Sequence, residues 1–241
     1  VLKLNINLLQ NIFILAMKIF RAYDIRGLYG SEVNEEIFEK IGFALSKMVN
    51  GKMAVGMDSR HSSPSLLNAL TRGLLAGNCE VLNLGYQPNP PVYYTCWSRK
   101  IYGAYVTASH NPPQYNGLKL VRPDGTSFIE EYKTLKNLVT KVGKIPDTVK
   151  GIKKDLNPLP SYIETVLNLV EVGRVKVVVE TFGSVLNYVV PMVFEETGVK
   201  YFLLHPEVRS DYYGLRPEPR PEVLSQLREK SSISLLSLIH I

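Results

Sequence analysis

The chain has 241 residues, of which 45% are hydrophobic and 21% are charged, and its formal net charge is +6. This composition fits a globular protein of one large or two ordinary domains and excludes an intrinsically disordered chain. Because the Lys and Arg residues are scattered and the two cysteines, Cys79 and Cys96, have no metal-ligand spacing, nucleic-acid binding, a disulfide framework and a zinc site are all disfavoured.

The N-terminal residues do not resemble the start of a protein. Residues 1–16 contain no Met, and the longest apolar run there, Ile12–Met17, is shorter than a signal-peptide core of ~7–15 residues or a membrane span of ~20. We expect Met17 to be the start and residues 1–16 to be a non-native upstream extension. An added N-terminal helix is the alternative.

Strands and helices alternate through the first half of the chain. The sequence predicts strands at Phe20–Gly27, Met53–Asp58, Val81–Gly85, Ile101–Thr107 and Leu118–Val121, and helices at Asn34–Met48, Leu66–Gly77, Pro91–Lys100 and Ile129–Val142. Ser63 is predicted to cap the second helix ahead of Pro64. Such alternation predicts an α/β fold with a sheet between two helical layers.

A serine-bearing loop follows the most apolar of these strands. The run Thr107-Ala108-Ser109-His110-Asn111-Pro112-Pro113 ends the strand, since proline cannot continue the ladder of hydrogen bonds. Ser109 is thereby presented at the carboxyl end of a strand, where ligands bind in open α/β sheets. Asn116-Gly117 predicts a further turn, after which the chain returns with Lys119.

A second unit is predicted after a polar segment rich in proline and lysine. We expect a first domain at residues 17–144, a linker at 145–156, a partial second domain at 157–230, and a tail at 231–241 that results from read-through. The strand Val175–Val179 is expected to keep an unpaired edge, because its unit supplies only one other clear strand, Tyr201–Leu204.

Three motifs resemble one enzyme family. Thr-Ala-Ser-His-Asn-Pro at 107–112 followed by Asn-Gly-x-Lys at 116–119 is similar to the active-site serine loop of the α-D-phosphohexomutases, the phosphomannomutase/phosphoglucomutase group. Tyr-Asp-Ile-Arg-Gly at 23–27 and Gly-x-Asp-x-Arg at 56–60 agree with this resemblance. It implies a three-layer α/β/α domain with a mixed four-stranded sheet, followed by the incomplete start of a second, similar domain.

The resemblance also implies a mechanism. Ser109 would carry a phosphoryl group, donate it to a hexose phosphate and recover it from the hexose 1,6-bisphosphate, with Mg²⁺ bound through the serine phosphate. It assigns catalytic roles to Ser109, Lys119 and His110, and substrate or phosphate contacts to Tyr23, Arg26, Arg60 and Asn111. Lys119 would be a general acid or base with a pKa lowered by burial. No nucleic acid or membrane is expected as a partner, the oligomeric state stays open, and the location expected is the cytoplasm.

Two features depart from the family. Glu180-Thr181-Phe182-Gly183-Ser184 replaces its usual Asp-x-x-x-Gly-x-Gly, so no chemistry is predicted there, and the Asp-Gly-Asp-x-Asp-Arg metal loop is not found in the sequence. The chain is therefore interpreted as an N-terminal fragment of a mutase, and a non-catalytic phosphosugar-binding protein is the alternative.

Each site residue also has an ordinary structural interpretation. Arg26 could pair with Asp24 on the surface, Arg60 could be a solvated loop charge, and Lys119 a solvated strand lysine. Ser109 could be a simple turn serine or the nucleophile of a hydrolase. The last of these is disfavoured because adjacent Ser109 and His110 side chains on an extended loop would point apart.

Overall fold

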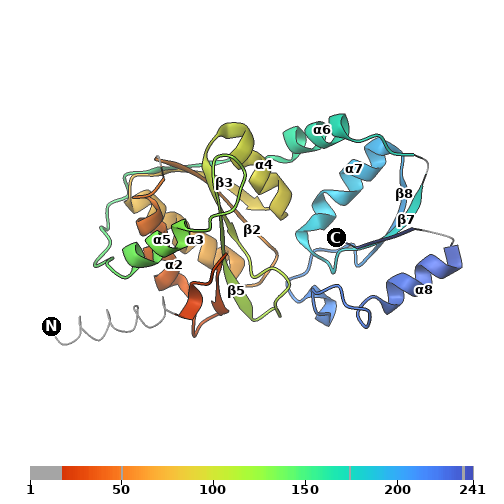
Figure 1. Ribbon diagram of the computed structural model, residues 1–241, viewed down its shortest axis with the longest axis horizontal. Coiled ribbons are helices and arrows are strands. Elements are labelled where there is room, and N and C mark those ends of the chain that lie inside the picture. Colours follow the sequence, from red (N-terminus) through yellow and green to blue (C-terminus); the bar gives the residue numbers. More distant parts are fainter. Residues whose placement is uncertain (1–17, 50, 174, 235–236, 241) are drawn as a thin grey trace.

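The structure is a computed structural model that describes residues 18–49, 51–173, 175–234 and 237–240. The expectation for residues 1–16 lies outside this part of the chain, and so do positions 235, 236 and 241 of the expected tail. The described residues form two sheet-containing units, which are arranged side by side in Figure 1.

The first unit alternates strands and helices along the chain. Its strands are β1 (Ile25–Leu28), β2 (Lys52–Met57), β3 (Glu80–Tyr86), β4 (Tyr102–Val106), β5 (Tyr115–Val121) and β6 (Ile152–Asp155). Its helices are α2 (Glu35–Leu45), α3 (Ser63–Ala76), α4 (Asn89–Arg99) and α5 (Glu131–Val139).

These strands form one mixed sheet in the order β1-β5-β4-β2-β3-β6. Strand β5 runs antiparallel to both of its neighbours, whereas β4, β2, β3 and β6 are mutually parallel. Alternate residues of the strands face opposite helical layers. Met53 and Val55 pack with α2, α3 and α5, while Ala54 packs with Val92 and Cys96 of α4. The predicted α/β/α layering is confirmed.

Three details of the predicted sheet are wrong. The sheet has six strands rather than four, and one of the six, β6, lies inside the segment expected to be a linker, 145–156. The first strand begins at Ile25 rather than Phe20. Asn116-Gly117 is not a turn but part of β5, because the chain reverses earlier, between Ser109 and Gln114.

The second unit is a small parallel sheet in the order β8-β7-β9. It contains β7 (Lys176–Glu180), β8 (Lys200–Leu204) and β9 (Ser237–His240), with α6 (Leu159–Leu169), η1 (Val185–Tyr188), α7 (Val190–Thr197), η2 (Tyr212–Gly214) and α8 (Ser225–Ser234) around them. Strand β7 is central, paired on both sides. The expectation that Val175–Val179 keeps an unpaired edge is therefore wrong.

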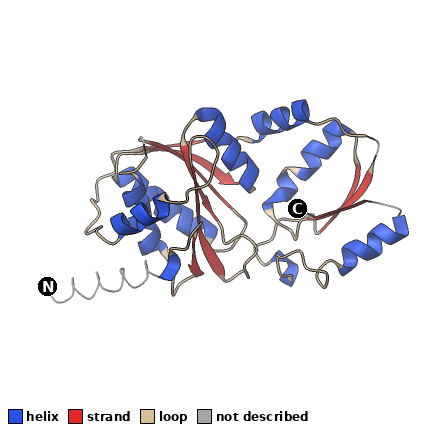
Figure 2. Ribbon diagram, in the orientation of Figure 1, coloured by secondary structure: helices blue, strands red, loops and turns tan. Residues whose placement is uncertain are grey.

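The two units meet across α4. Helix α6 packs beside α4, where the rings of Tyr94 and Tyr162 contact edge to face with centroids 5.7 Å apart. The Thr165 hydroxyl donates to Tyr94 Oη at 3.0 Å. Figure 2 shows the six-stranded sheet on one side of this junction and the smaller sheet on the other. The carboxyl ends of β2 and β4 therefore lie near the second unit.

None of the described helices combines the length and apolar character that a membrane crossing requires.

Cys79 and Cys96 are free, buried thiols, and burial raises their pKa values to about 11 and about 12. Both thiols therefore stay protonated and unreactive near neutral pH.

Candidate active site

The serine loop starts where β4 ends. Ser109 adopts a left-handed backbone conformation with φ 57°, which is uncommon for a residue with a side chain. Its N–H donates to Thr107 Oγ1 at 2.9 Å, and the N–H of Asn111 donates to the carbonyl of Ala108 at 3.2 Å. A non-glycine residue with positive φ persists only where its surroundings over-determine the backbone. The structure therefore has to supply a group that holds this loop.

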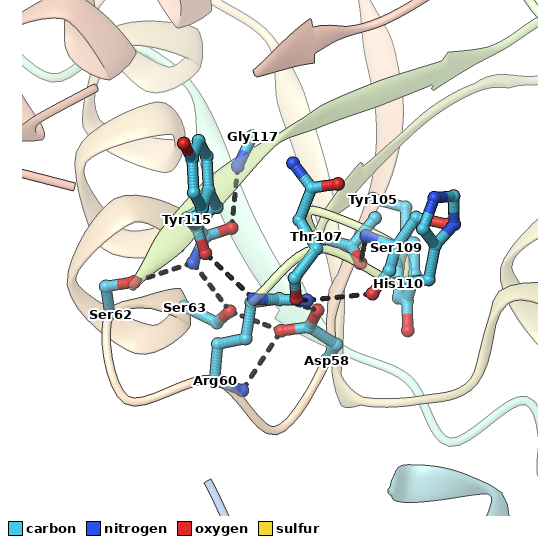
Figure 3. Close-up of polar contacts among 12 residues, drawn as sticks. Asp58, Arg60, Ser62, Ser63, Tyr105, Thr107, Ser109, His110, Tyr115 and Gly117 are labelled. Carbon is cyan, nitrogen blue, oxygen red and sulfur yellow. Dashed lines mark hydrogen bonds and ion pairs between the residues drawn. The ribbon is translucent and has the colours of Figure 1, made fainter. Parts of the chain in front are cut away.

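Arg60 is that group. Its side chain is fully buried, and all five of its N–H bonds are used. Figure 3 shows Arg60 with its partners Asp58, Ser109 and Tyr115. The Nε donates to Asp58 Oδ2 at 3.0 Å. The two terminal nitrogens donate at 2.7–3.0 Å to four backbone carbonyls of the serine loop and its return, those of Ser109, Asn111, Pro112 and Tyr115. A single guanidinium therefore fixes the path of the loop.

This geometry corrects the prediction for Arg60. The interpretation as a solvated loop charge is wrong, since the side chain is inaccessible to solvent. A direct phosphate contact does not fit either, because no N–H remains to donate to an anion. Arg60 instead positions the loop that presents Ser109.

Four buried polar residues lie around Arg60, and the sequence analysis did not predict their hydrogen bonds. Asp58 Oδ1 accepts from the N–H of Arg60 and from the hydroxyl of Ser63 at 2.6 Å. The Asn116 amide, 0% exposed, donates to the hydroxyls of Ser62 and Ser63. The helix cap predicted at Ser63 is displaced by one residue, since Ser62 occupies that position and the Ser63 hydroxyl is bound to Asp58. The Gly-x-Asp-x-Arg-x-Ser-Ser motif at residues 56–63 is the sequence feature that could have indicated this group of polar residues.

Gly117 explains why the Asn-Gly pair lies in a strand. A Cβ at this position would lie 2.1 Å from the carbonyl oxygen of Ile25, so β1 approaches β5 more closely than any side chain allows. The approach sets Arg26 opposite Gly117 in the register. Lys119 lies two residues further along β5, opposite Tyr105 of β4. Since side chains on one face recur every second residue, Arg26, Lys119 and Tyr105 share a face of the sheet.

Arg26 connects this face to the serine loop. One terminal nitrogen donates to Asn111 Oδ1 at 3.0 Å, and the other donates to Asp24. The pairing with Asp24 is therefore present, but it does not use the whole guanidinium, because the buried Nε has no hydrogen-bond partner among the described residues. Unlike Arg60, Arg26 keeps a donor for a further acceptor, and a buried donor without one is costly.

Lys119 has the environment expected of a group that changes protonation state. Burial lowers the pKa of its amine, the nearby Arg26 guanidinium lowers it further, and Asp24 opposes the shift. Lys119 is half-buried rather than fully solvated, and the direction of its pKa shift agrees with the prediction.

The side chains of Ser109 and His110 do not point apart as expected. Ser109 Oγ and His110 Nδ1 lie 3.4 Å apart, because the left-handed backbone at Ser109 brings adjacent side chains together. That separation is longer than a normal hydrogen bond of this type. His110 is exposed, and no carboxylate bonded to its ring is found among the described residues, so the third member of a hydrolase triad is lacking there.

The structure places Tyr23 away from this group. Its side chain is 68% exposed and lines a separate hollow beside the start of α5, with Phe20, Arg21 and Lys133. The prediction that Tyr23 faces the same cleft as Ser109 is therefore not supported by its position. The strand that would have carried it there begins two residues later.

A cavity of about 440 Å³ lies between the two units, in front of Ser109. The first unit contributes Asp58, Tyr105, Thr107, Ser109 and His110 to its wall. The second unit contributes residues that follow the carboxyl end of β7 and the loop around η2, namely Thr181, Phe182, Ser184, Val185, Leu186, Tyr212, Pro217 and Pro219. Part of the segment 180–184, for which no chemistry was predicted, therefore lines the same cavity as Ser109. The position of this segment directly after a buried strand is the sequence feature that could have indicated its place in the cavity wall.

The described residues lack the ligands that a magnesium ion requires. The described residues contain no group of three or more His, Cys, Asp and Glu side chains that could hold a metal ion. Asp58, a carboxylate that lines the same cavity as Ser109, is already bound to Arg60 and Ser63. Mg²⁺ binds mainly through several oxygen ligands, so these residues do not form a magnesium site by themselves.

Comparison with known proteins gives a consistent result. A family model described as phosphoglucomutase/phosphomannomutase, alpha/beta/alpha domain I, matches residues 17–145. The chain is 32% identical over 217 residues to the phosphopentomutase of Thermococcus kodakarensis and 32% identical over 225 residues to the phosphomannomutase/phosphoglucomutase of Pseudomonas aeruginosa. These alignments cover 88% and 90% of this chain and 48% of each relative, so the chain spans about half the length of the curated relatives it matches.

A solved structure is also similar. The crystal structure of a phosphoglucomutase/phosphomannomutase family protein from Burkholderia thailandensis superposes with a TM-score of 0.81 at 25% sequence identity. The match covers 92% of this chain and 51% of that protein. Both units are thus included in the similarity.

Proposed function

Because the chain belongs to the phosphoglucomutase/phosphomannomutase family, we propose that Ser109 is the phosphoryl carrier of a sugar-phosphate mutase. The observation that supports this most is the arrangement around Arg60, in which a buried guanidinium uses all five donors to hold the serine loop. Phosphoryl transfer depends mainly on positioning and charge neutralisation, so a rigidly held serine suits it.

The proposed reaction transfers one phosphoryl group in each direction. The P–O bond to Ser109 Oγ breaks as a hydroxyl of the sugar monophosphate forms a new P–O bond, and the hydroxyl proton passes to a base. The resulting bisphosphate then returns its other phosphoryl group to Ser109 Oγ, and the sugar oxygen left behind is protonated. The phosphoserine is regenerated and the sugar phosphate is isomerised.

Four further residues have roles in this proposal. Lys119 is the candidate general acid or base, because its lowered pKa makes both protonation states accessible nearer to neutral pH. Arg26 and the Asn111 amide it binds are candidates for phosphate contact, since Arg26 retains a free buried donor. For His110 we propose a role in orienting the loop or its phosphate, and for Tyr23 none.

The 241 residues supply the phosphoryl-carrying part of such a site in our proposal. They match about half of each relative, and their described residues do not form a magnesium site alone. Mg²⁺ would neutralise the serine phosphate when bound, and we propose that complete turnover needs ligands beyond those described. A cytoplasmic location belongs to the same proposal and is supported by two free, buried thiols.

The substrate class is proposed to be a hexose phosphate, glucose or mannose. One relative at 32% identity is named a phosphopentomutase, so a pentose phosphate is the second candidate. The cavity in front of Ser109 is about 440 Å³, which has room for either sugar phosphate, so its volume does not select between them.

The test is a transfer assay with the 241-residue chain. The chain is incubated separately with glucose 1,6-bisphosphate, mannose 1,6-bisphosphate and ribose 1,5-bisphosphate, and the intact mass is recorded over time. We expect one added phosphate with a preferred sugar and none in Ser109→Ala. A chain that binds these sugars but gains no phosphate would instead support the non-catalytic phosphosugar-binding alternative.

A further inference from the structure

The second unit reaches into the first at Tyr212. This side chain is only 3% exposed, although it lies on the short helix η2 in a loop of the second unit. Its ring lies over the Arg60 guanidinium, with Arg60 Cζ 5.5 Å from the ring centroid. Tyr212 lines the same cavity as Asp58 and Ser109. Burial first, and the neighbouring Asp58 second, raise the pKa of its phenol.

The geometry of Arg60 leaves a specific role for this ring. The N–H donors of a guanidinium lie in its plane, and those of Arg60 are all directed to Asp58 and the serine loop. Arg60 Cζ lies over the face of the Tyr212 ring. A cation over an aromatic face is attracted to the ring, and this attraction does not compete for the hydrogen bonds of the guanidinium.

The backbone around Tyr212 is held in an uncommon conformation. Tyr212 and Tyr213 have φ values of 52° and 57°, in the left-handed region. Asp211 fixes this turn, since its Oδ1 accepts from the N–H of Tyr213 at 3.2 Å and its carbonyl accepts from the N–H of Gly214 at 2.9 Å. Strained backbone of this kind persists where it directs a side chain, and here it directs Tyr212 toward Arg60.

We propose that Tyr212 is a positioning residue for Ser109: its ring covers the Arg60 guanidinium, so the second unit stabilises the conformation of the serine loop. The importance of this contact for phosphoryl transfer rests on the function proposed above. The contact itself does not depend on it, and it can be tested separately.

The first test measures the serine loop directly by amide hydrogen exchange on the full 241-residue chain. Three amides report on the loop: those of Ser109, Asn111 and Tyr115, which donate to Thr107 Oγ1 and to the carbonyls of Ala108 and Pro112. We expect Tyr212→Leu to accelerate their exchange about tenfold, because the ring is lost from a buried cation. Tyr212→Phe keeps the ring and should leave exchange within about twofold of the unmodified chain.

Tyr213→Leu is the matched control. Tyr213 lies on the same short helix, but its ring contacts His205 and Arg209 of its own unit. Its loss should leave the three loop amides unchanged. The proposal is overturned if Tyr213→Leu accelerates them as much as Tyr212→Leu, if Tyr212→Leu leaves them unchanged, or if Tyr212→Phe is as damaging as Tyr212→Leu.

A second measurement needs no substitution. In the unmodified chain, nuclear Overhauser effects between the Tyr212 ring and the Arg60 side chain are expected, and their absence would overturn the proposal even if Tyr212→Leu failed to fold. Phosphorylation of Ser109 by a sugar bisphosphate should be slowed in Tyr212→Leu and retained in Tyr212→Phe. If the unmodified chain is not phosphorylated at all, the proposed function fails while the exchange data still decide the role of Tyr212.

Discussion

At the scale of single residues, the candidate site depends on two arginines with different structural roles. Arg60 is buried with every donor bound, whereas Arg26 is bound to Asp24 and Asn111 and keeps one buried donor free. Sequence motifs pointed to both arginines but could not separate their roles. That distinction depends on hydrogen bonds that Arg60 donates to backbone carbonyls 49 to 55 positions away in the chain.

Replacing Arg60 should destabilise the protein strongly. Arg60→Ala leaves Asp58 buried without its cation and four loop carbonyls without donors, and we expect a loss of about 3–5 kcal/mol in the free energy of unfolding. Arg60→Lys should recover part of this, since an ammonium has three donors rather than five. The measurement is urea unfolding.

Arg72→Ala is the control for that experiment. Arg72 pairs with Glu39 on the surface, so its loss should cost less than about 1 kcal/mol. If Arg60→Ala and Arg72→Ala unfold at the same urea concentration, the loop is not held as described here.

The pH dependence of Lys119 follows from the direction of its pKa shift. Burial disfavours the charged amine, so on raising the pH Lys119 should lose its proton below the usual value of about 10.4 for lysine. Nuclear magnetic resonance titration of its ε-methylene group measures this midpoint. Arg26→Gln removes the second cause and should raise the midpoint. A titration at or above the ordinary lysine value would contradict the assigned environment.

At the scale of elements, the strands that sequence analysis found are those with a buried apolar pattern. Strand β6 was missed because all four of its residues, Ile152-Lys153-Lys154-Asp155, are exposed. It is held by backbone pairing with β3 and by side-chain contacts of Lys154 with Glu80 and Asp155 with Asn83. Charged edge strands carry no hydrophobic periodicity, so their pairing is invisible to a pattern analysis.

Strand β5 requires a glycine at position 117, because a side chain there would clash with β1. Gly117→Ala would place a methyl group 2.1 Å from the Ile25 carbonyl oxygen, so β1 and β5 must separate, at a cost of about 1–3 kcal/mol. Thermal and urea unfolding measure the change. Gly143→Ala, at an exposed glycine with no atom within 4 Å of the added Cβ, should be nearly neutral. Equal effects of the two substitutions would show that close strand approach is unimportant.

At the scale of the whole molecule, the two units combine to form the cavity in front of Ser109. The layer order of the first unit and the serine at a strand end were predictable from periodicity and motif. The contribution of residues 181–186 and Tyr212 was not, because it depends on how the second unit packs against α4 and on left-handed backbone at positions without glycine. Long-range packing of this kind leaves no local pattern in the sequence.

The central position of β7 gives a prediction opposite to the one made from sequence. Paired on both sides, the amides of Val177–Val179 should exchange more slowly than those of β8, which lies at the edge of its sheet. Residue-resolved hydrogen exchange compares the two strands. Faster exchange across β7 than across β8 would show that the small sheet does not have this order.

The central claim, that this fold presents Ser109 as a phosphoryl carrier, is tested most directly by locating the phosphate. Cleavage after Lys100 and Lys119 yields a peptide, 101–119, that also contains Thr107 and three tyrosines as competing acceptors. After incubation of the full chain with a sugar bisphosphate, fragmentation of this peptide should place a single phosphate on Ser109. Phosphate on Thr107 or a tyrosine instead, or a phosphorylated peptide from Ser109→Ala, would contradict the account.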